Sequence, residues 1–285
     1  MGDPFRNRKE LIALLAGRMP HYRELLSFYE KIYELQSRAE PRLSIKLPKQ
    51  ELRDIGVREG FPLLSRGEFA LDVSEASALF ESLCTAIKHA NETIETTIEI
   101  LEGAFSISAL RREELLRHHA DDAYLDGIAR DFDVESGVLR FLIHASILPS
   151  LRSHAEAIKK HLDLEKWLRG YCPICGSSPL IALLSGEGRR SFICSFCGTE
   201  WPGERLKCPH CETTDHTKLH YFCAEEDEGH RVDVCDNCNR YIKTVDCRKL
   251  DYEPDPILED VTTIHLDILA TEKGFLRLSS PSFRR

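Results

Sequence analysis

Eight of the chain's 11 cysteines stand in pairs separated by two residues, and thiolates at this spacing can hold a metal ion. The pairs are Cys172/Cys175, Cys194/Cys197, Cys208/Cys211 and Cys235/Cys238. A C-x-x-C segment forms one tight turn that points two sulfurs at the same ion, and two such turns complete a tetrahedral shell. Eight sulfurs therefore predict two four-cysteine metal sites.

The order of the pairs favours two consecutive units. Cys175 and Cys194 are separated by 18 residues, which fits a known metal-site pattern of two C-x-x-C motifs. Cys211 and Cys235 are separated by 23 residues, which a longer hairpin loop would accommodate. We therefore expect one site from the first four paired cysteines and one from the last four paired cysteines. A nested pairing, inner with inner and outer with outer, stays open.

Disulfide bonds are the competing interpretation of paired cysteines. A bond within C-x-x-C closes a very short loop, so it would remove little entropy from the unfolded chain. An odd total of 11 cysteines would also leave one thiol unpaired. A redox-active pair is expected in a βαβ setting, which the surrounding pattern does not predict. Metal binding is therefore favoured, and a thiol oxidoreductase with an exposed, metal-free pair is kept as an alternative.

The residue after each second cysteine differs between the two units. In metal-binding turns of this kind, that residue commonly needs positive φ so that backbone N–H groups can point at sulfur, and glycine adopts positive φ without strain. Gly176 and Gly198 occupy the position in the first unit, Glu212 and Asn239 in the second. Asparagine tolerates the left-handed region better than glutamate does. We expect a regular first site and a looser second one.

Charge and composition narrow the class of function. The 285 residues leave room for about two domains, and 42% hydrophobic with 30% charged residues is an ordinary globular composition. The formal net charge is −9, and residues 171–250 hold 10 Lys and Arg against 12 Asp and Glu. Nucleic-acid binding normally needs a basic face, so we expect no nucleic-acid partner and keep a nucleic-acid-binding zinc ribbon as the alternative function.

Two further features of the sequence concern the compartment. No apolar run approaches the length of a membrane span, so no membrane insertion is expected. Clustered thiolates held by metal suit a reducing cytoplasm. The sequence therefore predicts a cytoplasmic location.

The sequence before the cysteine motifs is typical of helices. Apolar residues recur at helical spacing in 1–40 and again from Ser74, which is expected to cap a helix. Residues 41–49 are expected to form an extended connector. Residues 50–73, with several glycines, are expected to be irregular and to pack on the helices. Pro149 is expected to kink or stop a central apolar helix, with another helix following it.

The period changes after residue 170. Apolar segments predict a hairpin in each unit, at 180–184 with 189–193 and at 219–222 with 232–234, followed by a strand at 241–245. The predicted fold is α+β: an all-α helical domain followed by two small modules of the rubredoxin or zinc-ribbon kind. The predicted domains are 1–168 for the helices, 169–207 for the first module and 208–285 for the second module with a C-terminal extension.

The residues around the cysteines are more specific than their spacing. The stretches that carry this are Tyr171–Ser177, Cys194–Trp201, Arg205–Cys208, Cys235–Lys243 and Glu272–Phe275. Together they resemble the formate dehydrogenase accessory protein family, FdhE. The resemblance covers the C-terminal half, and over 1–168 it rests on helical character.

The resemblance implies a cytoplasmic helper with two rubredoxin-like modules, each carrying one iron ion. Zinc is possible instead, because four thiolates suit both metals. It further implies a partner, the catalytic subunit of an exported formate dehydrogenase containing molybdenum or tungsten. No nucleophile–base set is visible in the sequence, so we expect a maturation factor and not an enzyme. The oligomeric state is not predicted.

Overall fold

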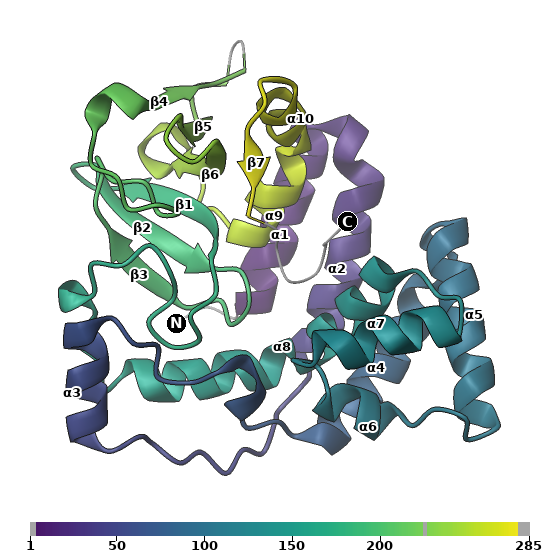
Figure 1. The fold of residues 1–285 in the computed structure, drawn as a ribbon. Coiled ribbons are helices and arrows are strands. Elements are labelled where there is room, and N and C mark those ends of the chain that lie inside the picture. Colours follow the sequence, from purple (N-terminus) through teal and green to yellow (C-terminus); the bar gives the residue numbers. More distant parts are fainter. Residues whose placement is uncertain (1–3, 225–226, 279–285) are drawn as a thin grey trace. The chain divides into compact units, whose positions relative to one another are not determined.

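The computed structural model describes residues 4–224 and 227–278. Two compact units divide these residues: 4–45 with 66–154 form one, and 46–65 with 155–278 form the other. The first unit is helical and the second contains the β-sheet, so the predicted α+β class is confirmed (Figure 1). Within the described ranges, no helix is both long enough and apolar enough to cross a membrane.

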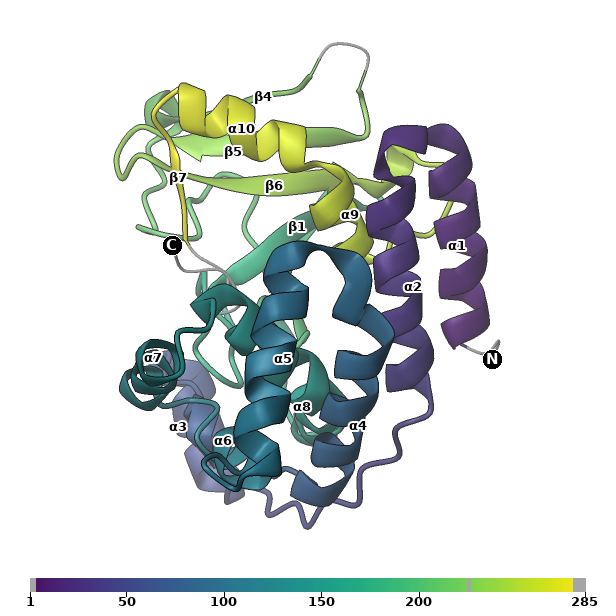
Figure 2. The same cartoon turned by 90° about the vertical axis from the view of Figure 1, so that its right-hand side faces the viewer.

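The first unit is built from amphipathic helices whose apolar sides face one another. Its helices are α1 Pro4–Arg18, α2 Arg23–Ser37, α4 Val73–Ile87, α5 Glu92–Ser106, α6 Arg112–Arg117, α7 Asp122–Asp131 and the larger part of α8 Ser136–Lys159. Helix α2 packs against α1 and α4, and α4 also packs against α6 (Figure 2). Leu26, Leu83, Ile98 and Leu115 are fully buried in it. The predicted helical character is therefore confirmed.

The start of α4 differs from the expectation. Asp72, not Ser74, is the N-cap residue: its Oδ1 accepts a bond from the Glu75 N–H at 3.1 Å. The second carboxylate oxygen accepts from the Arg42 N–H at 3.0 Å. These backbone hydrogen bonds, from Arg42 first and then Glu75, lower the pKa of Asp72. One carboxylate thus caps the helix and fixes the extended connector, which a serine hydroxyl at position 74 could not do.

Pro149 does not stop its helix, and the separate helix predicted after it is wrong. Helix α8 continues from Ser136 to Lys159 through this proline. Proline lacks an N–H, so the carbonyl of Ala145, four residues earlier, loses its helical partner. The side-chain Nε2 of Gln36 donates to that carbonyl at 2.7 Å. A long-range side chain therefore replaces the missing bond and lets the helix run on.

Residues 50–73 are not irregular throughout, as the sequence had led us to expect. Helix α3 spans Gln50–Glu59 and ends at Gly60, which has a φ of 83°. The segment 46–65 also belongs to the unit that contains the cysteines, and not to the helical one. We call residues 46–65 the strap.

The second unit contains a seven-stranded sheet that orders the cysteine motifs. Its strands are β1 Pro179–Ser185, β2 Arg189–Cys194, β3 Glu200–Gly203, β4 Leu219–Phe222, β5 His230–Cys235, β6 Arg240–Asp246 and β7 Leu276–Arg277. The order is β3-β2-β1-β6-β5-β4, with β7 beside β6 (Figure 1). Both predicted hairpins and the strand after the last cysteine pair are confirmed, whereas β3 was not anticipated.

The two cysteine modules share this sheet. Strands β1 and β6 pair in parallel, with Ala182 opposite Thr244 and Leu184 opposite Asp246. The small core around Ile181, Ile193 and Val245 therefore draws on both modules. The domain boundaries at 168/169 and 207/208 stay a prediction, because contacts in the folded chain do not show whether these segments fold independently.

Helices α9 Pro256–Thr262 and α10 Ile264–Glu272 follow the sheet in the same unit. Leu266 and Ala270 of α10 pack on Val232, Val234 and Tyr241 of the sheet. The C-terminal extension predicted for the second module thus consists largely of two helices. These apolar contacts attach α10 to strands β5 and β6 of the second module.

His230, at the start of β5, lies between two carboxylates. Its Nδ1 is 2.9 Å from Asp227 Oδ1, and its Nε2 is 2.7 Å from Oε2 of the fully buried Glu259. Burial opposes protonation of the ring, but the hydrogen bonds to Asp227 and Glu259 outweigh it and raise the pKa of His230 to about 9. The imidazolium therefore links the 227–230 turn to α9.

Replacing His230 by glutamine is expected to destabilise the protein in a pH-dependent way. Because the pKa is raised on folding, from about 6.5 to about 9, the stabilisation is complete below the lower value and is lost as the pH rises through the upper one. The loss should be on the order of 3 kcal/mol near neutral pH or below, and much smaller above about pH 10. Urea unfolding of both proteins across this range measures it.

His220→Gln is the matched control for this prediction. His220 is half-exposed and lies 3.6 Å from Asp236, so its replacement should change the unfolding free energy little at either pH. A His230→Gln effect that does not depend on pH would contradict the charged ring.

Candidate metal centres

The first four paired cysteines form one buried cluster. Cys172 and Cys175 precede β1, Cys194 ends β2, and Cys197 lies in the turn before β3. Their sulfurs all lie within 4.8 Å of one another and could hold a metal ion. The Sγ–Sγ separation is 3.7 Å between Cys172 and Cys197, and 3.4 Å between Cys175 and Cys194. Four sulfurs placed tetrahedrally at about 2.3 Å from an ion are about 3.8 Å apart, so the cluster fits one metal.

The last four paired cysteines form the second cluster. Cys208 and Cys211 precede β4, Cys235 ends β5, and Cys238 lies in the turn before β6. The Sγ–Sγ separations are 3.8 Å between Cys208 and Cys238 and 3.7 Å between Cys211 and Cys235. These sulfurs also lie within 4.8 Å of one another. The consecutive pairing is therefore confirmed and the nested pairing is wrong.

The metal-binding turns repeat one backbone geometry. In the first, the Gly176 N–H donates to the Cys172 carbonyl at 2.9 Å, and in the third the Glu212 N–H donates to the Cys208 carbonyl at 3.0 Å. Backbone N–H groups also point at sulfur: that of Phe196 lies 3.4 Å from Cys194 Sγ. Hydrogen bonds of this kind favour the thiolate over the thiol.

All four residues predicted to need positive φ have it. The φ values are 69° for Gly176, 75° for Gly198, 57° for Glu212 and 53° for Asn239. For a glutamate this conformation costs on the order of 1 kcal/mol or more. The Glu212 carboxylate lies 3.4 Å from Arg169 Nη1, a contact that offsets part of the cost.

The second cluster differs from the first in the exposure of its cysteines, whereas the backbone turns of both clusters share positive φ. All four sulfur-bearing residues of the first cluster are buried, whereas Cys211 and Cys238 of the second are half-buried. Burial acts to raise the pKa of the Cys211 thiol. Hydrogen bonds outweigh this effect, among them the one that the Asn237 amide donates to Cys211 Sγ at 3.4 Å, and lower the pKa to about 7. The second centre is therefore the one that solvent and partners can reach.

The chemistry of the donors calls for a cation. Burial raises the pKa of the Cys172 and Cys194 thiols well above its usual value, so four thiolates could not share the first cluster without positive charge. Zinc and iron both bind four thiolates in a tetrahedron. Four sulfurs complete such a shell, and among the residues that the structure describes neither cluster includes a fifth donor.

The strap is hydrogen-bonded to the first cysteine turn, a contact that the sequence did not predict. The N–H groups of Leu63 and Leu64 donate to the carbonyls of Pro173 and Ile174 at 3.2 and 2.8 Å. The hydroxyl of Tyr171 donates to the Gly60 carbonyl at 2.7 Å. These bonds join positions more than 100 residues apart, and no local pattern predicts them.

The rings of His210 and His230, both near the cysteine motifs in sequence, contact oxygen atoms. The His210 ring lies 3.2 Å from the carbonyl of Tyr241, and the His230 ring contacts Asp227 and Glu259. Only the backbone N–H of His210 points at sulfur, 3.4 Å from Cys208. Trp201 of β3 is buried against Phe192 and donates to the Arg169 carbonyl at 3.1 Å.

Thiol titration of the metal-loaded protein is expected to find the three remaining cysteines in a fixed order. Cys223 is exposed and should react at once, and the half-buried Cys247 should react more slowly. Cys84 is 4% exposed, and burial raises the pKa of its thiol to about 12, so it should react only after unfolding. Denaturation with a chelator should release all 11 thiols. More than three reactive groups in the native protein would instead favour the thiol oxidoreductase alternative.

A helical unit together with two four-sulfur clusters on one shared sheet defines an α+β protein of the metal-binding class. Family models match the two modules separately: residues 171–205 match the FdhE central domain and residues 206–283 the FdhE C-terminal domain. The chain belongs to the FdhE family.

Relatives extend the match beyond the cysteine modules. The FdhE homolog of Aquifex aeolicus is 29% identical over 276 residues, which cover 94% of this chain and 90% of that protein. FdhE of Escherichia coli K12 is 32% identical over 119 residues, 40% of this chain and 38% of that one. The crystal structure of the FdhE protein from Pseudomonas aeruginosa aligns with a TM-score of 0.69 at 24% identity, covering 97% and 94% of the two chains, and so shares the fold.

Proposed function

We propose that this protein is a non-enzymatic, cytoplasmic accessory factor that binds the catalytic subunit of an exported formate dehydrogenase and is needed for its activity. The observation that carries the proposal is the coincidence of the two FdhE domain matches, 171–205 and 206–283, with the two four-cysteine clusters. The metal-binding architecture is thus the part of the chain that defines the family.

The form of the sites supports a binding role. Each cluster supplies four sulfurs to one ion, which leaves no position for a substrate. The ligands we assign are Cys172, Cys175, Cys194 and Cys197 for the first ion and Cys208, Cys211, Cys235 and Cys238 for the second. We propose iron for both, with zinc as the alternative. A bound iron–thiolate centre can change its oxidation state, whereas zinc only crosslinks.

Co-purification with a formate dehydrogenase catalytic subunit tests the proposal. We expect the subunit to be retained by the tagged protein and lost when Cys208→Ser removes a ligand of the more exposed centre. Cys223→Ser is the matched control, because Cys223 is exposed and lies outside both clusters. If the unaltered tagged protein does not retain the catalytic subunit, the proposal is overturned. Equal retention by both variants would show that the second module is not part of the contact surface.

The matched family models and relatives give no support to the nucleic-acid-binding alternative.

A further inference from the structure

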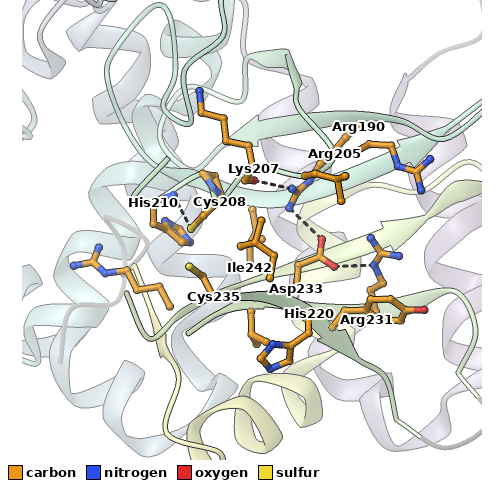
Figure 3. Close-up of a pocket in the computed structure, with 16 residues that line it drawn as sticks. Arg190, Arg205, Lys207, Cys208, His210, His220, Arg231, Asp233, Cys235 and Ile242 are labelled. Atoms are coloured by element: carbon orange, nitrogen blue, oxygen red, sulfur yellow. Dashed lines mark hydrogen bonds and ion pairs between the residues drawn. The ribbon is translucent and has the colours of Figure 1, made fainter. Parts of the chain in front are cut away.

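A pocket of about 170 Å³ lies beside the second cluster and is walled by both modules (Figure 3). Four arginines contribute to its lining: Arg190, Arg205, Arg231 and Arg240. Asp233 is the acidic side chain of this lining. In a chain with a formal net charge of −9, such a gathering of guanidinium groups is unusual.

Arg190 is the most informative of these residues. Its side chain is 4% exposed, and its Nη2 lies 3.1 Å from Asp233 Oδ2. Its Nη1 makes only long contacts, 3.3 Å to the Lys207 carbonyl and 3.5 Å to that of Glu204, and its Nε has no partner. A buried guanidinium with unused donors is costly unless an acceptor arrives.

The remaining arginines are also short of anions. The Arg231 Nε lies 2.8 Å from the other oxygen of Asp233, so Asp233 serves Arg190 and Arg231 at once, as Figure 3 shows. Arg205 and Arg240 form no ion pair within the described part of the chain. Lys207 also lines the pocket, but its ammonium donates to the Leu168 carbonyl at 2.9 Å.

The charges of the lining indicate the sign of the missing ligand. Four arginines and Lys207 line the pocket against one acidic side chain, Asp233, so cations outnumber carboxylates there. A carboxylate supplies one negative charge and matches the planar fork of arginine. The pocket is smaller than the roughly 300–1,000 Å³ of sites for drug-sized molecules, so it fits a single side chain.

The rim adds an apolar component. Leu206 and Tyr221 both line the pocket, yet they are 69% and 60% exposed. The Arg231 guanidinium lies 4.5 Å from the centre of the Tyr221 ring and holds it in place. Large exposed apolar side chains beside a charged pocket are typical of a protein-binding surface.

We propose that this pocket receives an Asp or Glu side chain of the partner protein, with an apolar neighbour resting on Leu206 and Tyr221. The inference rests on the proposed function for the identity of the partner, the formate dehydrogenase catalytic subunit. The pocket itself recognises an acidic residue flanked by an apolar one. Both modules then contact the partner together through this pocket.

Peptide binding to the full-length, metal-loaded protein tests the pocket without the partner. The probe is a Leu-Glu-Leu peptide acetylated at its N-terminus and amidated at its C-terminus, compared by calorimetry with the same blocked form of Leu-Gln-Leu and with free acetate at the same ionic strength. We expect the Glu peptide to bind at least about tenfold more tightly than either. Arg190→Gln and Arg205→Gln should each weaken its binding about tenfold. Should Arg190→Gln fail to fold, Arg205→Gln decides, because its side chain is exposed and makes no ion pair.

Arg189→Gln is the matched control, since Arg189 is the strand neighbour of Arg190 and pairs with Glu165 at an exposed position. Equal binding of the two peptides, or equal losses in Arg189→Gln and the pocket variants, would overturn the inference. Tighter binding of acetate than of the Glu peptide would assign the pocket to a free small anion and overturn the docking role. Co-purification with the catalytic subunit that survives Arg190→Gln and Arg205→Gln would also overturn the inference while leaving the proposed function intact.

Discussion

Removal of both metal ions is expected to unfold the unit that contains the sheet and to leave the helical unit folded. Structural metal sites of this kind contribute on the order of 10 kcal/mol each, as much as the whole stability of a typical domain. Within the described residues, one apolar cluster of the sheet has three buried side chains at its centre, Ile181, Ile193 and Val245. Hydrogen exchange after strong chelation should therefore show lost protection in β1, β2, β5 and β6, with protection kept in α4, α5 and α7.

Single ligand changes separate the two centres in this experiment. Cys172→Ser should expose the first module and the strap, because Leu63 and Leu64 bond to the carbonyls of the first metal-binding turn. Cys247→Ser, outside both clusters, should leave exchange unchanged. Full protection of the sheet in metal-free protein would show that the ions are not the main source of its stability.

Replacing Lys243 by methionine should give the largest loss of stability expected from a change outside the metal centres. Lys243 is 1% exposed, and its Nζ lies 2.9 Å from Asp260 and 2.7 Å from Asp267. Without it, the two largely buried carboxylates keep Arg277 as their one cationic partner among the described residues. Breaking one partner of a buried ion network costs about 3 kcal/mol or more. Urea unfolding monitored on the metal-loaded protein would measure this loss.

Lys249→Met is the control for Lys243→Met, because it makes the same change of charge and side-chain shape at a half-exposed position. Lys249 is half-exposed and pairs with the exposed Glu228 at 2.9 Å, so its replacement should cost at most about 1 kcal/mol. If the two variants lose equal stability, the buried network does not fasten α9 and α10 to the sheet.

The metal clusters could be predicted from the sequence because their geometry is local. Two sulfurs three positions apart share one turn wherever the turn lies, and the hairpin between two such turns brings the second pair to the first. The same reasoning placed positive φ at Gly176, Gly198, Glu212 and Asn239. It did not anticipate that Arg169 would lie beside Glu212 in the folded chain.

The features that were missed depend on partners distant in the sequence. Pro149 lies within α8 because Gln36 donates to the carbonyl that the proline leaves free. The strap belongs with the first metal-binding turn because Leu63 and Leu64 bond to it. Neither Gln36 nor Leu64 stands in a pattern that predicts these contacts. The arginine pocket is of the same kind, since it gathers residues from separate strands.

The most direct test of the account is the metal content and sulfur coordination of the protein as isolated. Elemental analysis should find two ions per chain, and X-ray absorption at the metal edge should find four sulfur neighbours at about 2.3 Å around each. Fewer than two ions, or nitrogen and oxygen in place of sulfur, would contradict the assignment of the eight paired cysteines.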